Sequence, residues 1–278
     1  MPRGHGWPGR YNHRVFDLTQ STHPFLIGGG ALETMDAGGC RLSIPPISRG
    51  YADAQIDDTQ GLSRQRFRWT PPLRLVVRAR VEPASPAGTW GFGFWNDPFA
   101  VSLGQGGAAR RWPCGPRALW FFYASPPNEF GFTAGPRNGW RAMSIDTREV
   151  HPLLLTPAAL AAAALAQLPI VRRPVMQLAL AQVTASEARL PGPGTEVHEY
   201  DLTWERSAAT FRVDGGIVLR AEKPPTAPLG FIAWIDNQYA IATPRRGLHF
   251  GTLATELGQF LHLQHVSITP LAPTSRGP

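Results

Sequence analysis

Three acidic residues of this chain have the type and placement that acid–base chemistry requires. Asp97, Glu129 and Asp236 each stand at the end of a predicted strand or in the turn after one. If strand ends bring two carboxyl groups to one rim, one can give a proton while the other takes one. Acids in turns more often accept hydrogen bonds from their own backbone. The three residues are therefore candidates for catalysis, with a purely structural role as the alternative.

A second set of residues could bind a ligand without transforming it. At two strand ends an aromatic residue is followed by an acid two residues later, Trp95 by Asp97 and Trp234 by Asp236. An apolar ring can pack against a ligand while the neighbouring polar group makes hydrogen bonds. Large rings also fill β-sandwich cores, so a core position remains the alternative for each. The predicted ligand-binding residues are Trp95, Asn96, Trp120, Tyr123, Trp234, Asp236 and Asn237.

The elements that must position these residues read as β-strands. Residues 200–204 alternate apolar and polar side chains, which is the two-residue period of a half-buried strand. Asp214-Gly215-Gly216 predicts a tight hairpin turn, because glycine accepts a positive φ. We predict a flexible loop over 185–196. The predicted strands are 16–18, 31–35, 40–44, 65–69, 73–81, 90–95, 118–124, 176–184, 197–204, 210–213, 231–235 and 259–269.

Length and composition indicate one large all-β domain. The chain has 278 residues, and its 29 glycines and 28 prolines favour many turns over a helical bundle. We expect a flexible leader over 1–12, a single sandwich domain over 13–269 and a flexible tail over 270–278. One short helix is expected over about 156–168, where Thr156 suits the N-cap and Pro157 the first helical position before an alanine-rich run.

Charge and cysteine content exclude several classes of protein. The net charge is +7, but the arginines are scattered and match no helical or zinc-finger pattern for nucleic acid, so we expect no nucleic-acid partner. Cys40 and Cys114 fit two reduced thiols rather than a disulfide framework. The N-terminal residues lack a signal-peptide core, and no apolar run is long enough for a membrane span. These features predict a cytoplasmic protein without membrane contact, or a secreted one if a signal peptide had been removed.

The order of the segments resembles glycoside hydrolase family sixteen, within the concanavalin A-like lectin/glucanase superfamily. The resemblance spans about residues 70–269. It rests on the strand 73–81 followed by GTWGFGFW at 88–95, on RWPCG at 111–115, and on the hairpin and strand within 197–237. It implies a concanavalin A-like jelly-roll β-sandwich of two curved antiparallel sheets, with the one short helix inserted. It also implies that the aromatic residues line a sugar groove on the concave sheet.

The sequence departs from that family where its chemistry should be. The family's catalytic strand reads Glu-x-Asp-x-x-Glu, and a retaining mechanism needs two carboxyl groups about 5–5.5 Å apart. The corresponding residues here, 116–123, read PRALWFFY and contain no acid. No catalytic residue is therefore carried over from the resemblance. The family's structural calcium is also in doubt, because histidines 262 and 265 replace the expected oxygen ligand in the last strand. No other cofactor is indicated.

The sequence leaves three functions open. The leading one is a carbohydrate-binding or catalytically degenerate glucanase-like protein with an aromatic-lined groove. The second is a glycoside hydrolase, or another small-molecule enzyme, that uses relocated acids in the same groove. The third is a protein interaction module. The expected partner in the first two is a carbohydrate or another small molecule.

Overall fold

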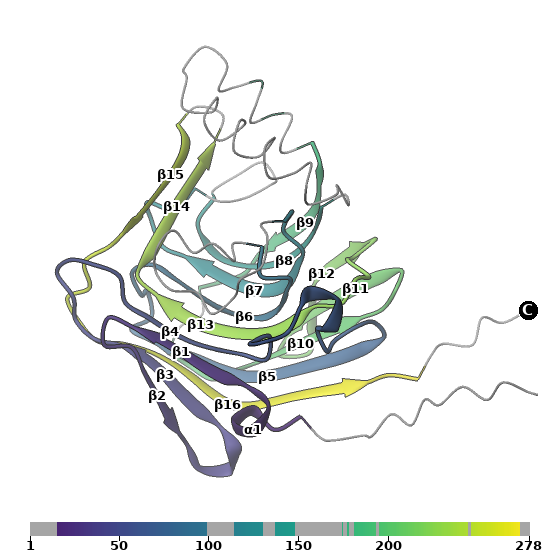
Figure 1. Cartoon of the computed structure of the whole chain (residues 1–278), viewed down its shortest axis with the longest axis horizontal. Coiled ribbons are helices and arrows are strands. Elements are labelled where there is room, and N and C mark those ends of the chain that lie inside the picture. Colours follow the sequence, from purple (N-terminus) through teal and green to yellow (C-terminus); the bar gives the residue numbers. More distant parts are fainter. Residues whose placement is uncertain are drawn as a thin grey trace, which may run out of the picture.

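Two seven-stranded antiparallel sheets stack face to face (Figure 1). The first sheet has the order β1 (His23–Ile27), β4 (Asp53–Asp57), β13 (Gly230–Asp236), β6 (Thr89–Trp95), β7 (Ala118–Ala124), β8 (Gly139–Thr147), β9 (Val183–Arg189). The second has the order β12 (Gly216–Glu222), β11 (Ala208–Val213), β10 (His198–Trp204), β5 (Leu73–Glu82), β16 (Gln259–Pro270), β3 (Cys40–Ile44), β2 (Ala31–Thr34). The hairpin of β14 (Gln238–Thr243) and β15 (Gly247–Thr252) forms a separate two-stranded sheet. The predicted all-β sandwich is confirmed.

This computed structural model describes residues 16–98, 114–129, 137–147, 174, 177, 181–192, 195–243 and 246–272. Besides the strands, these residues include a four-residue helix α1 (Leu18–Ser21) and two 3-10 turns, Asp36–Gly38 and Arg64–Arg66. The predicted helix over 156–168 and the predicted leader over 1–12 lie outside the described residues, as does the predicted tail beyond 272.

The core between the sheets follows from the alternation of side chains along each strand. In β5, Leu73, Val77 and Ala79 are buried, while Arg74 and Arg78 are exposed. Each fully buried leucine or valine side chain stabilises the fold by about 1.5–3 kcal/mol relative to leaving it in water. The alternation therefore seals the second sheet onto the first and leaves its other face charged.

The first sheet differs because its central strands are apolar on both faces. Every residue of β7 and of β13 is buried. Phe92, Phe94 and Phe121 point into the core between the sheets. Trp120 and Trp234, on the opposite face, belong to a second apolar cluster. Figure 1 shows this sheet curved, with its hollow side turned away from the second sheet. We call that side the outer face.

The hairpin predicted near residue 214 is confirmed. Asp214 and Gly215 both have positive φ, of 48° and 81°, and they join β11 to β12. Positive φ at two successive residues is the geometry of the tight turns that match the twist of paired strands.

Several local predictions were wrong. Residues 16–18 form no strand, because helix α1 begins at Leu18, and the strand predicted over 176–184 begins only at Val183. Residues 65–69 form no strand; Arg64–Arg66 is a 3-10 turn, because no neighbouring strand pairs with it. The predicted loop over 185–196 begins too early, because β9 continues to Arg189. Its polar residues are tolerated because the strand lies at the edge of the first sheet.

Candidate functional site

The outer face of the first sheet carries a cluster of aromatic rings. Strand register places Trp234 of β13, Gly91 of β6 and Phe122 of β7 side by side. The ring centroid of Trp120 lies 5.5 Å from those of both Phe122 and Trp234. The ring of Trp95 extends the cluster, with its centroid 6.3 Å from that of Trp120. We call Trp95, Trp120, Phe122 and Trp234 the outer aromatic cluster.

Two glycines of β6 leave room for these rings. A Cβ atom added at Gly91 would lie 2.8 Å from Cη2 of Trp234 and 2.3 Å from a backbone oxygen of β7. Gly93 has φ +149°, and a Cβ there would lie 2.6 Å from the Cα of Trp120. Only glycine fits at both positions, so the alternating sequence WGFGF on β6 shapes the floor under the outer aromatic cluster.

Two indole N–H groups of the cluster have no hydrogen-bond partner. The Nε1 atoms of Trp95 and Trp120 are buried and unpaired. Trp234 differs, since its N–H donates to Oγ1 of Thr89 at 2.9 Å. A buried donor left unpaired costs about 1–3 kcal/mol. The two indoles could recover that free energy by donating to an acceptor on a ligand.

A buried carboxyl pair lies at one end of the cluster. Asp236 of β13 stands opposite Asp53 of β4 in register, and the two residues are 7% and 2% exposed. Oδ1 of Asp236 accepts hydrogen bonds from Oγ1 and N of Thr89, at 2.8 and 3.1 Å, and from N of Gln238 at 3.0 Å. Oδ1 of Asp53 is buried without a partner. Asp53 therefore adds an unpaired acceptor to the face.

Burial raises the pKa of both carboxyl groups. For Asp53 the negative charge of Asp236 raises the pKa further, and the Tyr51 hydroxyl only partly offsets this. Burial raises the pKa of Asp236 to about 7, even though the hydrogen bonds from Thr89 favour its charged form. The pair therefore keeps its protons to a higher pH than exposed carboxyl groups do, which would allow one member to donate a hydrogen bond.

Arginines lie at the other end of the cluster, on the β8 side. Nη1 of Arg141 lies 3.4 Å from Oε2 of Glu187, and these side chains are 3% and 7% exposed. Arg189 stands opposite Arg141 in register. Burial lowers the pKa of Arg141, Glu187 opposes this, and the charges of Arg189 and Arg137 lower it further. The outer face is thus acidic at one end, aromatic in the middle and basic at the other end.

The structure brings four of the sequence-predicted site residues to this face: Trp95, Trp120, Trp234 and Asp236. Tyr123 is not among them, because its side chain lies on the opposite face of β7 from those of Trp120 and Phe122. Its ring packs 5.9 Å from that of Trp90 in the core between the sheets. Alternation along β7 therefore gives Tyr123 a core position.

The two predicted asparagines hold backbone segments in place. Oδ1 of Asn96 accepts a hydrogen bond from N of Arg117, and its Nδ2 donates to the carbonyl oxygen of Gly115. Asn237 is fully buried, and its side-chain amide bonds to backbone atoms of Gly50, Ala52 and Leu253. Asn237 thereby anchors the start of the β14–β15 hairpin, which in Figure 1 rises on the hollow side of the first sheet.

The three acids expected from the sequence do not converge. Asp236 pairs with Thr89 at the start of β6, whereas Asp97 follows the end of that strand. β6 has seven residues, so its two ends are six steps apart, or roughly 20 Å at 3.3 Å per residue. Glu129 bridges to Ile241 of β14 and forms an ion pair with Arg246 at 2.8 Å. Asp53 is the acid that meets Asp236.

Sequence reasoning missed Asp53 because it missed β4. The signal was present, since Asp53, Gln55 and Asp57 alternate with the apolar Ala54 and Ile56. That is a two-residue period with its polar side on the outer face. Gln55 stands beside Trp234 in register, and its Nε2 donates to Oδ2 of Asp57 at 2.9 Å.

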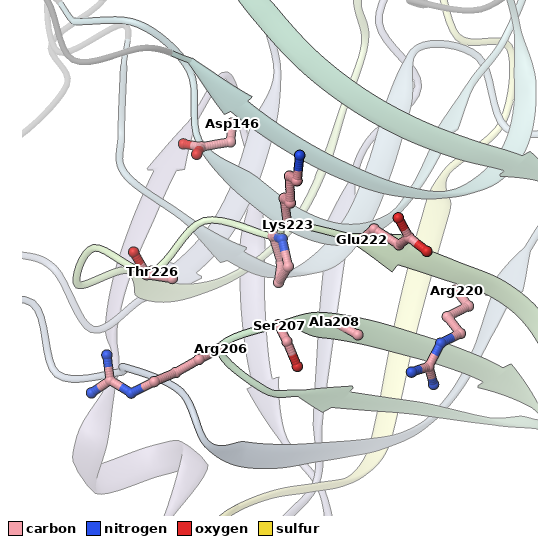
Figure 2. A pocket seen from close by; sticks show the side chains of 9 residues that line it. Asp146, Arg206, Ser207, Ala208, Arg220, Glu222, Lys223 and Thr226 are labelled. Atoms are coloured by element: carbon pink, nitrogen blue, oxygen red, sulfur yellow. The ribbon is translucent and has the colours of Figure 1, made fainter.

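A separate hollow of about 490 Å³ lies beside β12, at the edge of the second sheet (Figure 2). Its lining residues are Asp146, Arg206, Ser207, Ala208, Arg220, Glu222, Lys223, Pro224 and Thr226. In Figure 2 the charged ends of Arg206 and Arg220 lie far apart and do not point toward each other, and Lys223 points in a third direction. This hollow therefore lacks polar groups that converge on one point.

Among the residues that the structure describes, no group of three or more His, Cys, Asp or Glu side chains is arranged to hold a metal ion. His262, near which the resemblance placed a calcium ligand, is buried, and burial lowers its pKa to about 4. Within the same described ranges, no helix is long and apolar enough to cross a membrane.

No protein-family model matches the chain, and no curated protein matches it. Among solved structures it is similar to a legume lectin-like domain from Entamoeba histolytica, with a TM-score of 0.47, 7% identity and 92% of each chain covered. It is also similar to a Bacillus licheniformis β-glucanase, with a TM-score of 0.46, 11% identity and 94% of each chain covered. LamAcat from Zobellia galactanivorans has a TM-score of 0.44 and 12% identity, with 84% of this chain and 78% of that one covered. At these identities and TM-scores, nothing about activity or ligand follows from the likeness.

Proposed function

We propose that this protein binds a saccharide on the outer face of its first sheet, against the outer aromatic cluster. The observation that carries the proposal is the pair of buried, unpaired indole N–H groups of Trp95 and Trp120. Buried polar groups are almost always hydrogen-bonded in folded proteins, so unpaired ones need an explanation. A bound molecule with acceptor oxygens would supply one.

A saccharide fits both kinds of surface that the face presents. A sugar ring has an apolar side that can pack on an aromatic ring and hydroxyl groups around its edge that accept and donate hydrogen bonds. The outer aromatic cluster offers the rings and the two indole donors, and Oδ1 of Asp53 offers an unpaired acceptor. Sites of this type combine an apolar lining with a few placed polar groups.

The composition of β7 supports binding over the cleavage known from the family that the sequence resembles. Its outward residues are Ala118, Trp120, Phe122 and Ala124, none of which can act as acid, base or nucleophile. A strand with these residues can hold a sugar but cannot attack one.

Affinity electrophoresis in gels containing soluble polysaccharides tests the proposal. Trp95→Phe and Trp120→Phe keep a ring but remove the N–H, so we expect each to weaken retardation about tenfold, the equivalent of about 1.4 kcal/mol. Trp90→Phe is the matched control, because its N–H is also buried and unpaired but lies in the core between the sheets. If no polysaccharide retards the wild type, or if all three variants behave alike, the proposal is wrong.

A second candidate function is acid–base chemistry on the bound sugar. The supporting observation is the buried pair of Asp53 and Asp236, whose raised pKa values let one group remain protonated near neutral pH. This candidate predicts that the wild type releases reducing ends from a saccharide that it binds. Asp53→Asn should abolish release while binding persists, and Glu129→Gln should change neither. Wild-type protein that binds a saccharide without cleaving it would exclude this function.

A further inference from the structure

The arginines of β8 and β9 continue the outer aromatic cluster across the sheet. In register, Trp234 lies beside Gly91, then Phe122, then Arg141, then Arg189. Adjacent strands are about 4.8 Å apart, so Arg141 lies one strand away from Phe122. A ligand resting on Phe122 would therefore reach the guanidinium groups with an edge substituent.

Positive charge exceeds negative charge at this end of the face. Arg137, Arg141 and Arg189 lie close enough for the first and last to lower the pKa of Arg141. Glu187 forms an ion pair with Arg141. Arg137 and Arg189 add two further positive charges beside that pair. Each of these guanidinium groups repels the others, so the cluster has a cost that an anion would remove.

Two details show that the cluster is built rather than incidental. Nη1 of Arg137 is buried without a hydrogen-bond partner. Nη2 of Arg141 donates to the carbonyl oxygen of Asn138 at 3.0 Å, which fixes the guanidinium in place.

We infer that the saccharide bound on the outer face carries an anionic group, a carboxylate or a sulfate, that Arg137, Arg141 and Arg189 bind. The inference rests on the proposed function, since it assigns the ligand class of the same face. Guanidinium groups match such anions well because they present parallel N–H donors. The carboxyl pair at the opposite end would repel a second anion, so the charged group should point toward β9.

Three polysaccharides of the same sugar separate the possibilities: neutral galactan, polygalacturonate and sulfated galactan. We expect the wild type to be retarded more strongly by at least one of the two acidic polymers than by galactan. Preference for polygalacturonate assigns a carboxylate, and preference for sulfated galactan assigns a sulfate. Arg189→Gln and Arg137→Gln should each weaken that retardation about tenfold, as expected for one lost charge-assisted bond. Retardation by neutral galactan should stay unchanged in both variants.

The matched control is Arg78→Gln, which removes one positive charge from an exposed residue of β5 on the second sheet. It should bind acidic polymers like the wild type. If Arg78→Gln and Arg189→Gln weaken binding equally, the attraction is due to net charge alone and the inference is wrong. If galactan binds in a manner that depends on Trp120, but no acidic polymer binds better, the inference fails while the proposed function stands. If no polymer binds at all, both fail.

Discussion

The two faces of the first sheet are made from the same strands, yet they differ in what surrounds their rings. On the inner face, Phe92 lies 5.1 Å from Tyr200 of β10, and Phe121 lies 5.4 Å from Phe211 of β11. The second sheet thus closes the inner face with apolar contacts. On the outer face, the rings lie between a carboxyl pair and an arginine cluster.

This difference separates residues that make the fold from residues that can serve a ligand. Rings closed on both sides by apolar neighbours contribute stability, and a ligand cannot reach even the unpaired N–H of Trp90 among them. The outer aromatic cluster retains 7–8% exposure at Trp120, Phe122 and Trp234, together with unpaired donors at Trp95 and Trp120. Aromatic content alone would not distinguish the two faces; the polar groups at the ends of the outer one do.

The largest loss of stability should come from removing a ring from the inner face. Phe92→Ala removes a fully buried ring and should lower the free energy of unfolding by about 3–5 kcal/mol. Trp95→Ala, on the outer face, should cost less than about 2 kcal/mol, because that ring is partly exposed. Urea unfolding followed by circular dichroism compares the two. Equal losses would show that both faces are closed cores.

The carboxyl pair should make stability depend on pH. Both pKa values are raised on folding, so between about pH 4 and about pH 7 the folded state binds more protons than the unfolded state. The free energy of unfolding should then fall as the pH rises through that window, by on the order of 2–4 kcal/mol. Asp53→Asn should remove most of the fall and be more stable than the wild type at pH 8. Urea midpoints at pH 4.5 and pH 8 measure this, with Glu129→Gln as the control. A wild type that gains stability over the same range would contradict the raised pKa values.

Filling the floor of the outer face should have an intermediate effect. Gly91→Ala places a methyl group against the ring of Trp234 and should cost about 1–3 kcal/mol. It should also change the tryptophan fluorescence by moving that ring. Gly192→Ala is the matched control, because nothing lies within 4 Å of a Cβ there, and it should stay within about 0.5 kcal/mol of the wild type. Equal stability and equal fluorescence of the two variants would show that Gly91 is not required for the packing of Trp234.

The smallest expected change in stability is the most direct test of the difference between the two faces. Trp95→Phe removes an unpaired donor together with part of a ring, so the free energy of unfolding should change by less than about 1 kcal/mol. Trp90→Phe, on the closed face, should cost about 1–3 kcal/mol because it leaves a cavity. Chemical denaturation of both variants tests the ordering. A larger loss for Trp95→Phe would mean that its N–H is paired.

Local patterns were enough to predict the strongly periodic and the strongly apolar strands. The bounds predicted for β7 match the structure, as do those of β5 and β10 within one residue. The alternation of β4 was overlooked, because the strand offers only Ala54 and Ile56 as apolar residues, and the alternation of residues 65–69 was misleading, because of these residues only Trp69 forms a bridge, with Leu229. A strand forms only when another strand completes its hydrogen bonds, and a local pattern does not contain that information.

The sequence by itself determined that β7 would be apolar on both faces and would carry no carboxylate. Both are properties of consecutive residues, and alternation assigns consecutive residues to faces without reference to the rest of the chain. Only the tertiary structure decided that Asp53 meets Asp236, that Asp97 lies at the far end of β6, and that Arg189 joins Arg141. Those pairings depend on the order and register of strands distant in the sequence, which the packing of the two sheets selects.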